Sequence, residues 1–408
     1  MIVTAPGGEK ADAGPAKWIW MRTTFGILVS MDGGKSFRWI CEKAMGYSGQ
    51  FDPPVSVLAD GRLLVGTDDG VVSTMDGCSF AHEPGLQGEA VRDLTTDAAG
   101  NVAFAITGAR GKPGRVWKRG VSGKWVKVGK DYDDINFITI DVAPSNPRRI
   151  YITGEPWSTV RGEVWISNDE GATFVEQKQE KLQANGPFFL SYVDPKNQDH
   201  IIMRHLHYQG SDLLVSTDGG KTVREILHWK GSMVGFAKSA DGSKVWISDG
   251  SEQTGIWRST DRGEHFEPMA KEGVYCLFAA GPLLYACNSP STLGGYALGV
   301  STDEGKTLDK LSGFADVAGA PLCDGGASIC EASWPETQAA VLPSPDAGLP
   351  LPADAGADAG PIAAPPARSN CGCEAVGASP WTPWSIFFLG GLIPLAVRAR
   401  ARRRVDHS

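Results

Sequence analysis

One octapeptide recurs along the 408-residue chain and restricts what the chain can fold into. It reads Ser-Met-Asp-Gly-Gly-Lys-Ser-Phe at 30–37 and returns at 167–174, 216–223, 259–266 and 301–308, with a contracted copy at 74–80. Its aspartates are Asp32, Asp76, Asp169, Asp218, Asp261 and Asp303, spaced by 44, 93, 49, 43 and 42 residues. The longest gap is about twice the others, and residues 120–128, near its midpoint, keep the turn glycine and an aromatic residue. The spacing therefore predicts seven repeats.

Turn residues divide each repeat into short apolar or alternating segments. Residues 137–177 contain four of them, at 137–142, 149–153, 162–167 and 173–177. No sustained 3.6-residue period occurs before about residue 315, which indicates an all-β domain. Four strands in every 42 to 49 residues is the period of a propeller blade. We expect a seven-bladed β-propeller of four-stranded antiparallel blades over residues 17–315.

The octapeptide resembles the BNR or Asp-box repeat, Ser-x-Asp-x-Gly-x-Thr/Ser-Trp/Phe, and the seven repeats are similar to the photosystem assembly factor type of propeller. The likeness covers roughly residues 17–311. In that family the motif lies in the turn between the third and fourth strands of a blade. This chain departs from it at His265, which stands at the Thr position, and at Val223 and Leu308, which replace the aromatic residue.

The chemistry of the octapeptide indicates a structural role. A short Asp side chain accepts backbone N–H groups two residues on, glycine takes the positive φ of the turn, and the hydroxyls satisfy other turn groups. The last residue is expected in the blade core. A calcium loop would need several carboxylates around one ion, whereas each copy holds one or two. We expect neither a metal nor a cofactor.

Turns between strands three and four would leave the opposite face of the disc for a ligand. The loops between strands two and three and the blade-to-blade connections build that face. Aromatic side chains in these loops are candidates for stacking on sugars or peptides, with ordinary loop packing as the alternative. The binding candidates are Tyr47, Trp157, Arg161 and Tyr208.

The same loops are acidic, which raises an enzymatic alternative. Asp133, Asp134 and Glu155 would supply the paired carboxylates that glycoside hydrolysis needs, although acidic loops are usually only solvated. Asp-box sialidases also carry an early Arg-Ile-Pro motif, an arginine triad and a Tyr/Glu nucleophile pair. The chain contains no Arg-Ile-Pro. The resemblance therefore implies the fold and not the activity.

Two histidines raise the question of a metal site. His205 and His207 alternate on one predicted strand and so point to one side. No Cys or third His stands nearby in the sequence to complete a zinc set. We therefore expect no metal at this strand.

The C-terminal quarter has a different composition. A cysteine-containing extension, 316–341, precedes a Pro-, Ala-, Asp- and Gly-rich linker, 342–370, which cannot build a core and predicts a disordered stalk. Residues 371–408 begin with Cys-Gly-Cys, continue with an apolar segment at 381–397 and end in an arginine cluster. That segment is at the short limit for one hydrophobic membrane-spanning helix, and the arginines favour the cytoplasmic side.

This tripartite tail resembles the myxobacterial C-terminal sorting signal. The resemblance implies recognition and removal by a membrane protease, with Cys371 and Cys373 involved in anchoring. A permanent single-span anchor is the alternative. Both models predict that the chain is exported and is attached to the cell surface or outer envelope through its C-terminus.

The other six cysteines fit an exported chain, because disulfides persist in oxidising compartments. Cys41 and Cys78 are placed to join neighbouring blades. Cys276 and Cys287 face each other across a predicted hairpin, and Cys323 and Cys330 would close a short loop. Connectivity cannot be deduced from the sequence alone.

The N-terminus does not fit this interpretation. Residues 1–16 contain neither the basic start nor the apolar run of an export signal, and they are expected to be unstructured. The first repeat also lacks an innermost strand. Either residues 314–320 return to close the ring, or the natural start lies upstream of Met1. We favour the second, because it explains both absences.

The net charge of −8 and a pI near 5.5 argue against a nucleic-acid partner. The sequence therefore predicts a secreted, surface-tethered propeller that binds a glycan or a protein without catalysis. The alternative is a glycosidase-like or lyase-like surface enzyme.

Overall fold

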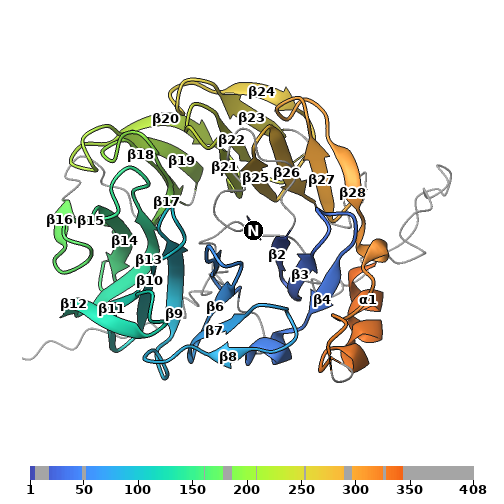
Figure 1. The fold of residues 1–408 in the computed structure, drawn as a ribbon. Coiled ribbons are helices and arrows are strands. Elements are labelled where there is room, and N and C mark those ends of the chain that lie inside the picture. The colour runs from blue at the N-terminus through green and yellow to red at the C-terminus, as the bar shows by residue number, and fades with distance from the viewer. Residues whose placement is uncertain are drawn as a thin grey trace, which may run out of the picture. The chain divides into compact units, whose positions relative to one another are not determined.

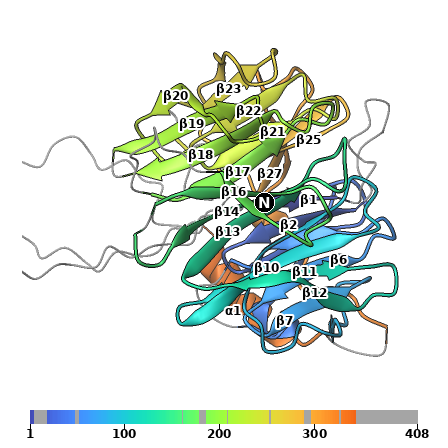
Figure 2. The same ribbon diagram turned by 90° about the vertical axis from the view of Figure 1, so that its left-hand side faces the viewer.

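Seven four-stranded antiparallel sheets surround a central axis as the blades of a propeller (Figures 1 and 2). The computed structural model describes residues 1–4, 18–47, 52–159, 161–177, 186–207, 209–251, 254–288, 296–324 and 328–342, all within one compact unit, Met1–Ala378. The four strands of each blade are consecutive in the chain. The predicted fold class is confirmed. The predicted helix at 381–397 lies outside the described residues.

The first three blades contain twelve strands. Blade 1 comprises β1 (Ile2–Val3), β2 (Ile19–Thr23), β3 (Gly26–Ser30) and β4 (Arg38–Ile40). Blade 2 comprises β5 (Val55–Val57), β6 (Leu63–Thr67), β7 (Gly70–Thr74) and β8 (Ala81–His82). Blade 3 comprises β9 (Val91–Thr96), β10 (Ala103–Ala109), β11 (Lys112–Arg119) and β12 (Trp125–Tyr132).

The remaining four blades follow in the same order. Blade 4 comprises β13 (Ile135–Val142), β14 (Ile150–Pro156), β15 (Glu163–Ser167) and β16 (Val175–Gln177). Blade 5 comprises β17 (Phe188–Val193), β18 (Ile201–His207), β19 (Gly210–Ser216) and β20 (Arg224–Trp229). Blade 6 comprises β21 (Gly235–Lys238), β22 (Val245–Ser248), β23 (Ile256–Ser259) and β24 (Glu267–Ala270). Blade 7 comprises β25 (Cys276–Ala280), β26 (Leu283–Cys287), β27 (Leu298–Ser301) and β28 (Asp309–Ser312).

The hydrophobic core is divided among the interfaces between neighbouring blades. Phe104 of blade 3, for example, packs in one cluster with Phe137 and Trp165 of blade 4. Seven such clusters occur, one for each interface around the ring. Each blade therefore buries both faces of its sheet against its neighbours, which explains why consecutive residues of its second strand are buried, as in β10.

The six octapeptide copies, which we call the repeated turns, join the third and fourth strands of their blades, as predicted. In the first of them, Ser30 Oγ donates to Asp32 and accepts the N–H of Gly34 at 2.8 Å. Asp32 Oδ1 accepts the N–H of Ser36, four residues on rather than the expected two. His265 takes the place of the usual hydroxyl, with its Nδ1 2.6 Å from Asp261 Oδ2. These contacts account for the motif without a metal.

The first blade is complete, contrary to the sequence-based expectation. Ile2 and Val3 form its innermost strand and pair antiparallel with Met21 and Trp20. Two residues are too few to show a periodic pattern, so the sequence offered no signal for this strand. Residues 314–320 also return to blade 1, but to its outer edge, where Phe37 bridges Val317.

The extension after blade 7 covers the outer edge of blade 1. It contains η2 (Phe314–Asp316), η3 (Glu331–Ser333) and α1 (Trp334–Val341), and the loop after β4 contains η1 (Glu42–Met45). Trp39 N donates to Gly319 O at 2.8 Å, and the Trp39 ring packs on Trp334 with centroids 5.3 Å apart. Figure 1 shows α1 beside β4, outside the ring. The extension therefore takes part in closing the ring.

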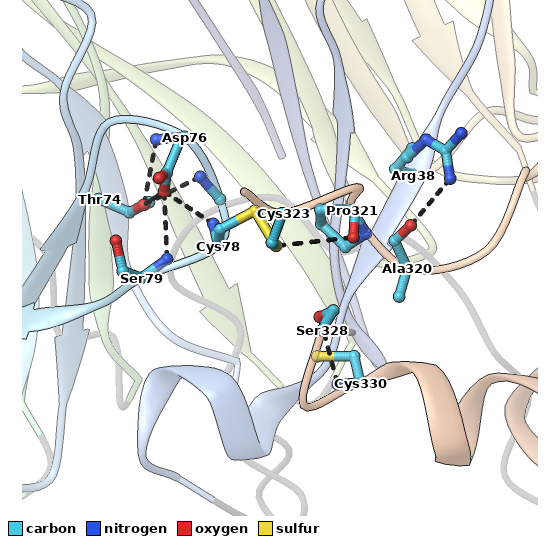
Figure 3. The surroundings of a disulfide bond; sticks show 11 residues. Arg38, Thr74, Asp76, Cys78, Ser79, Ala320, Pro321, Cys323, Ser328 and Cys330 are labelled. Atoms are coloured by element: carbon cyan, nitrogen blue, oxygen red, sulfur yellow. Dashed lines mark hydrogen bonds between the residues drawn. A yellow bond between two sulfur atoms is a disulfide. The ribbon is translucent and has the colours of Figure 1, made fainter. Parts of the chain in front are cut away.

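Two disulfides fasten the extension, and their pairing corrects the sequence-based expectation. Cys41 bonds to Cys330 and Cys78 to Cys323, instead of Cys41 to Cys78 and Cys323 to Cys330. Figure 3 shows Cys78 within the repeated turn of Asp76, with Cys323 reaching it from the extension. The third pair, Cys276 with Cys287, is confirmed, because these residues are direct partners on β25 and β26.

Candidate functional site

The face opposite the repeated turns carries a cavity of about 540 Å³ between blades 3 and 4. Three segments line it: the turn from β10 to β11, the connection from β12 to β13, and the loop after β14. Its lining residues are Arg110, Gly111, Lys112, Pro113, Asp133, Asp134, Trp157 and Ser158. The structure thus brings together one predicted aromatic residue and two predicted acidic residues.

Two hydrogen bonds hold two of these segments together. Trp157 N donates to Asp134 O at 2.9 Å, and Ser158 Oγ donates to the Asp134 carboxylate at 2.5 Å. Asp134 has a φ of 57°, a left-handed conformation that Asp tolerates better than most residues. The indole of Trp157 is half-buried at the cavity, whereas Asp133 and Asp134 are exposed. The cavity therefore offers an aromatic surface flanked by carboxylates and by the cationic Arg110 and Lys112.

The other acidic residues near this cavity, Asp131 and Glu155, interact with side chains that do not line it. Asp131 forms ion pairs with Lys127 at 2.5 Å and Arg115 at 3.1 Å, and these contacts lower its pKa. Glu155 is buried, and burial raises the pKa of its carboxyl. Its Oε1 accepts from Asn136 at 3.4 Å, and Glu155 is not among the described residues that line the cavity. The structure does not assemble the three predicted carboxylates into one site.

The remaining binding candidates do not join this cavity. Tyr47 is only 9% exposed and packs in the core between blades 1 and 2, which raises the pKa of its hydroxyl through burial. Arg161 is exposed, and its backbone forms an isolated β-bridge with Gly186. Tyr208 lies outside the described residues.

A second cavity, of about 350 Å³, lies among the innermost strands and contains carboxylates that the sequence analysis missed. Asp93 on β9 and Asp141 on β13 line it, together with Arg204 and Lys238. Burial, together with the smaller effect of the nearby Asp141, raises the pKa of Asp93 to about 7. Asp93 also accepts the N–H groups of Leu94 and Ile140, each at 2.9 Å, and so joins blade 3 to blade 4. The available signal was an acidic residue in the first strand of a blade, Asp93 in β9 and Asp141 in β13.

The structure brings a third histidine, distant in the sequence, close to His205 and His207. The ring of His228, on β20, stacks on His207 with centroids 5.7 Å apart. Asp212 is on β19, which lies between β18 and β20, and its carboxylate contacts all three imidazoles. Strand pairing brings these residues together, and their sequence separation conceals it.

Comparisons with known proteins identify no family. No protein-family model matches the sequence, and no curated protein is significantly similar to it. Among solved structures, the GH74 xyloglucanase from Xanthomonas campestris is 14% identical, with a TM-score of 0.37 over 78% of this chain and 65% of that one. The GH74 enzyme of Niastella koreensis is 15% identical, with a TM-score of 0.36 over 77% and 63%. This chain thus spans less than two thirds of either enzyme.

Hydrazine synthase from Kuenenia stuttgartiensis is 13% identical, with a TM-score of 0.46 over 74% of this chain and 94% of that one. At these identities and scores, none of the three bears on the activity of this chain. Within the part of the chain that the structure describes, no helix has the length and apolarity needed to cross a membrane. The apolar segment at 381–397 and the two cysteines at 371 and 373 lie outside that part.

Proposed function

We propose that this protein is an exported propeller that binds a glycan on the face opposite the repeated turns, without catalysis. The observation that supports this function is the placement of Trp157 in a cavity with Asp133 and Asp134. Indole rings stack on the apolar faces of sugars, and carboxylates accept hydrogen bonds from sugar hydroxyls. A protein ligand would use the same aromatic surface and is the other outcome of a binding screen.

The arrangement of carboxylates favours binding over hydrolysis. Glycosidases hold two carboxyl groups about 5 to 9.5 Å apart on either side of the scissile bond, and one of them has a raised pKa. Asp133 and Asp134 are adjacent and exposed, while the protonatable Glu155 is buried away from the described cavity lining. The glycosidase-like alternative would require a rearrangement that places Glu155 at the bound sugar.

Export is supported by the three disulfides, which indicate an oxidising environment. We propose further that the chain belongs to the Asp-box propellers and is attached to the envelope through residues 371–408. Under this proposal Cys371 and Cys373 belong to the sorting signal, a membrane protease is one partner, and the membrane is another.

A glycan array probed with the full-length protein in detergent tests the binding function. Wild type is expected to bind a defined group of glycans. Trp157→Ala should bind the same glycans with an affinity at least about tenfold lower, because buried Trp contacts dominate interfaces. Trp157→Phe should retain part of the affinity. Met31→Ala, an exposed apolar change in a repeated turn on the other face, is the matched control.

Incubation of each bound glycan with the protein then separates binding from hydrolysis. The proposal predicts no release of reducing ends. Turnover that disappears in Glu155→Gln would replace it with the glycosidase-like alternative. Equal binding by wild type and Trp157→Ala would exclude the cavity as the site.

A further inference from the structure

Three neighbouring strands of blade 5 place imidazoles and carboxylates on one side of the sheet. His205 on β18 is the direct partner of Asp212 on β19, which is in turn the partner of His228 on β20. His207 lies two residues further along β18 and therefore on the same side as His205. It is the last residue before the loop to β19, so this cluster lies at the face opposite the repeated turns.

A β-bulge adds a fifth side chain to the cluster. The pairing between β19 and β20 shifts by one residue, so that Leu213 pairs with Leu227 and Leu214 with Glu225. The extra residue reverses the alternation, which puts Glu225 and His228 on the same side although they are three residues apart. Regular alternation from the sequence would have separated them.

The distances around Asp212 match a coordination site. Its Oδ2 lies 3.5 Å from Nδ1 of His205 and 3.2 Å from Nε2 of His207. A tetrahedral zinc ion, with bonds of about 2.0 to 2.2 Å to nitrogen and oxygen, holds its ligand atoms about 3.3 to 3.6 Å apart. The first of these separations is too long for a good hydrogen bond. The ligand atoms of these three residues all lie within 4.8 Å of one another.

We propose that His205, His207 and Asp212 bind a divalent cation of the zinc class, with the fourth position open toward the ligand face. Two imidazoles and one carboxylate are a ligand set that zinc accepts, and three protein ligands leave a site for water or an incoming ligand. The site is partly enclosed, since the three side chains are 3%, 12% and 16% exposed.

His228 supports the ligands rather than completing them. Its Nδ1 lies 2.7 Å from Oδ1 of Asp212, the oxygen that does not face the other two histidines. Carboxylate ligands are commonly oriented by such a hydrogen bond. The ring of His205 is fixed from its other side by an edge contact with Phe188, with centroids 5.3 Å apart.

Cation binding requires the hydrogen bond between the Gln209 amide and His207 to open. The N–H of Gln209 donates to Nδ1 of His207 at 3.2 Å, which places the proton of a neutral ring on Nε2. A cation on Nε2 moves that proton to Nδ1, so the two donors would then face each other. The amide of Gln209 is therefore expected to report binding through its nitrogen and proton chemical shifts.

The test is a zinc titration by calorimetry of the full-length, disulfide-bonded protein near neutral pH. Free thiols are alkylated first, so that Cys371 and Cys373 contribute nothing. Wild type should bind one equivalent, and His207→Gln and Asp212→Asn should abolish this binding. His228→Gln should weaken it by about 10- to 100-fold. His82→Gln, an exposed histidine on β8, is the matched control and should behave as wild type.

Cobalt supplies an independent readout, because a tetrahedral cobalt ion absorbs strongly in the visible range. These bands should appear with wild type and be missing in His207→Gln and Asp212→Asn. Circular dichroism and the mass of the three disulfides verify that each variant is folded. The proposal is overturned if wild type binds no zinc, or if folded His207→Gln and Asp212→Asn bind it unchanged.

Discussion

The sulfur of Cys41, just after the last strand of blade 1, is bonded to the sulfur of Cys330, 289 residues later in the chain. Since all four strands of every blade are consecutive, no described strand from the end of the propeller joins the first sheet. Closure of the ring depends instead on the core between blades 7 and 1, on the extension that follows β28, and on the two disulfides that hold this extension.

The long-range disulfides should therefore stabilise the protein more than the local one. Replacing Cys41, Cys78, Cys323 and Cys330 together by Ser is expected to lower the free energy of unfolding by about 5 kcal/mol, because the closed loops are long. Replacing Cys276 and Cys287, which are 11 residues apart, should cost about 3 kcal/mol or less. Urea unfolding measures both, and equal losses would contradict the closure role.

The fourth position of the repeated turn has a positive φ, and where a residue other than glycine occupies it, that residue links neighbouring blades. Gly33 and Gly219 occupy it in two turns, whereas Glu170, Arg262 and Glu304 occupy it in three others with φ values of 60°, 65° and 64°. Each of the three pairs with the preceding blade. The contacts are Glu170 with Lys118, Arg262 with Asp194, and Glu304 with Lys244 and Arg258.

Two glycine substitutions at this position should act in opposite directions. Glu170→Gly relieves about 1 kcal/mol of strain and removes a partly exposed ion pair worth about 0 to 1 kcal/mol, so stability should be unchanged or slightly higher. Arg262→Gly leaves the carboxylate of Asp194, which is 1% exposed, without its cation, and should cost about 3 kcal/mol. Urea unfolding of both variants checks this. A stabilised Arg262→Gly would show that strain outweighs the buried charge.

Asp93 should make the stability of the ring depend on pH. Its pKa is raised from 3.8 to about 7 in the folded chain, mainly by burial. The fold therefore prefers the protonated carboxyl, and the resulting stabilisation is complete below pH 3.8 and is lost as the pH rises through about 7. The free energy of unfolding should fall over this window in wild type and fall less steeply in Asp93→Asn.

For Asp93, the relevant measurement is the slope of the free energy of unfolding against pH, and not its absolute value. An amide cannot accept both N–H groups that the carboxylate accepts, so Asp93→Asn is expected to be destabilised at every pH by about 1 to 3 kcal/mol. Parallel pH profiles for the two proteins would show that the carboxyl of Asp93 does not titrate in this range.

The C-terminal residues should be dispensable for folding. A chain that ends at Asn370 retains every described element and is expected to be released into the medium with an unchanged melting temperature. Replacing Cys371 and Cys373 by Ser in the full-length chain distinguishes the two anchoring models. Accumulation of uncut precursor, detected by mass and fractionation, would support a sorting signal, whereas unchanged mass and location would support a plain membrane anchor.

The sequence by itself determined the parts of the structure that depend on neighbours along the chain. The repeated turn is built from Ser, Asp and Gly within five residues, so the spacing of its six copies was enough to predict seven blades, while the resemblance to the Asp-box repeat implied where the turn lies in a blade. Cys276 and Cys287 belong to one hairpin, and hairpin register is local, so their bond was also predictable.

The tertiary structure alone decided what depends on where distant segments arrive. The partner of Cys41 is Cys330 because the extension folds back over blade 1, and no local pattern specifies that path. Ile2 and Val3 complete a sheet whose other strands begin at Ile19. His228 joins His205 and His207 only because two strand pairings and one bulge align them. Side chains that converge across strands are set by register and packing, and sequence periodicity does not record either.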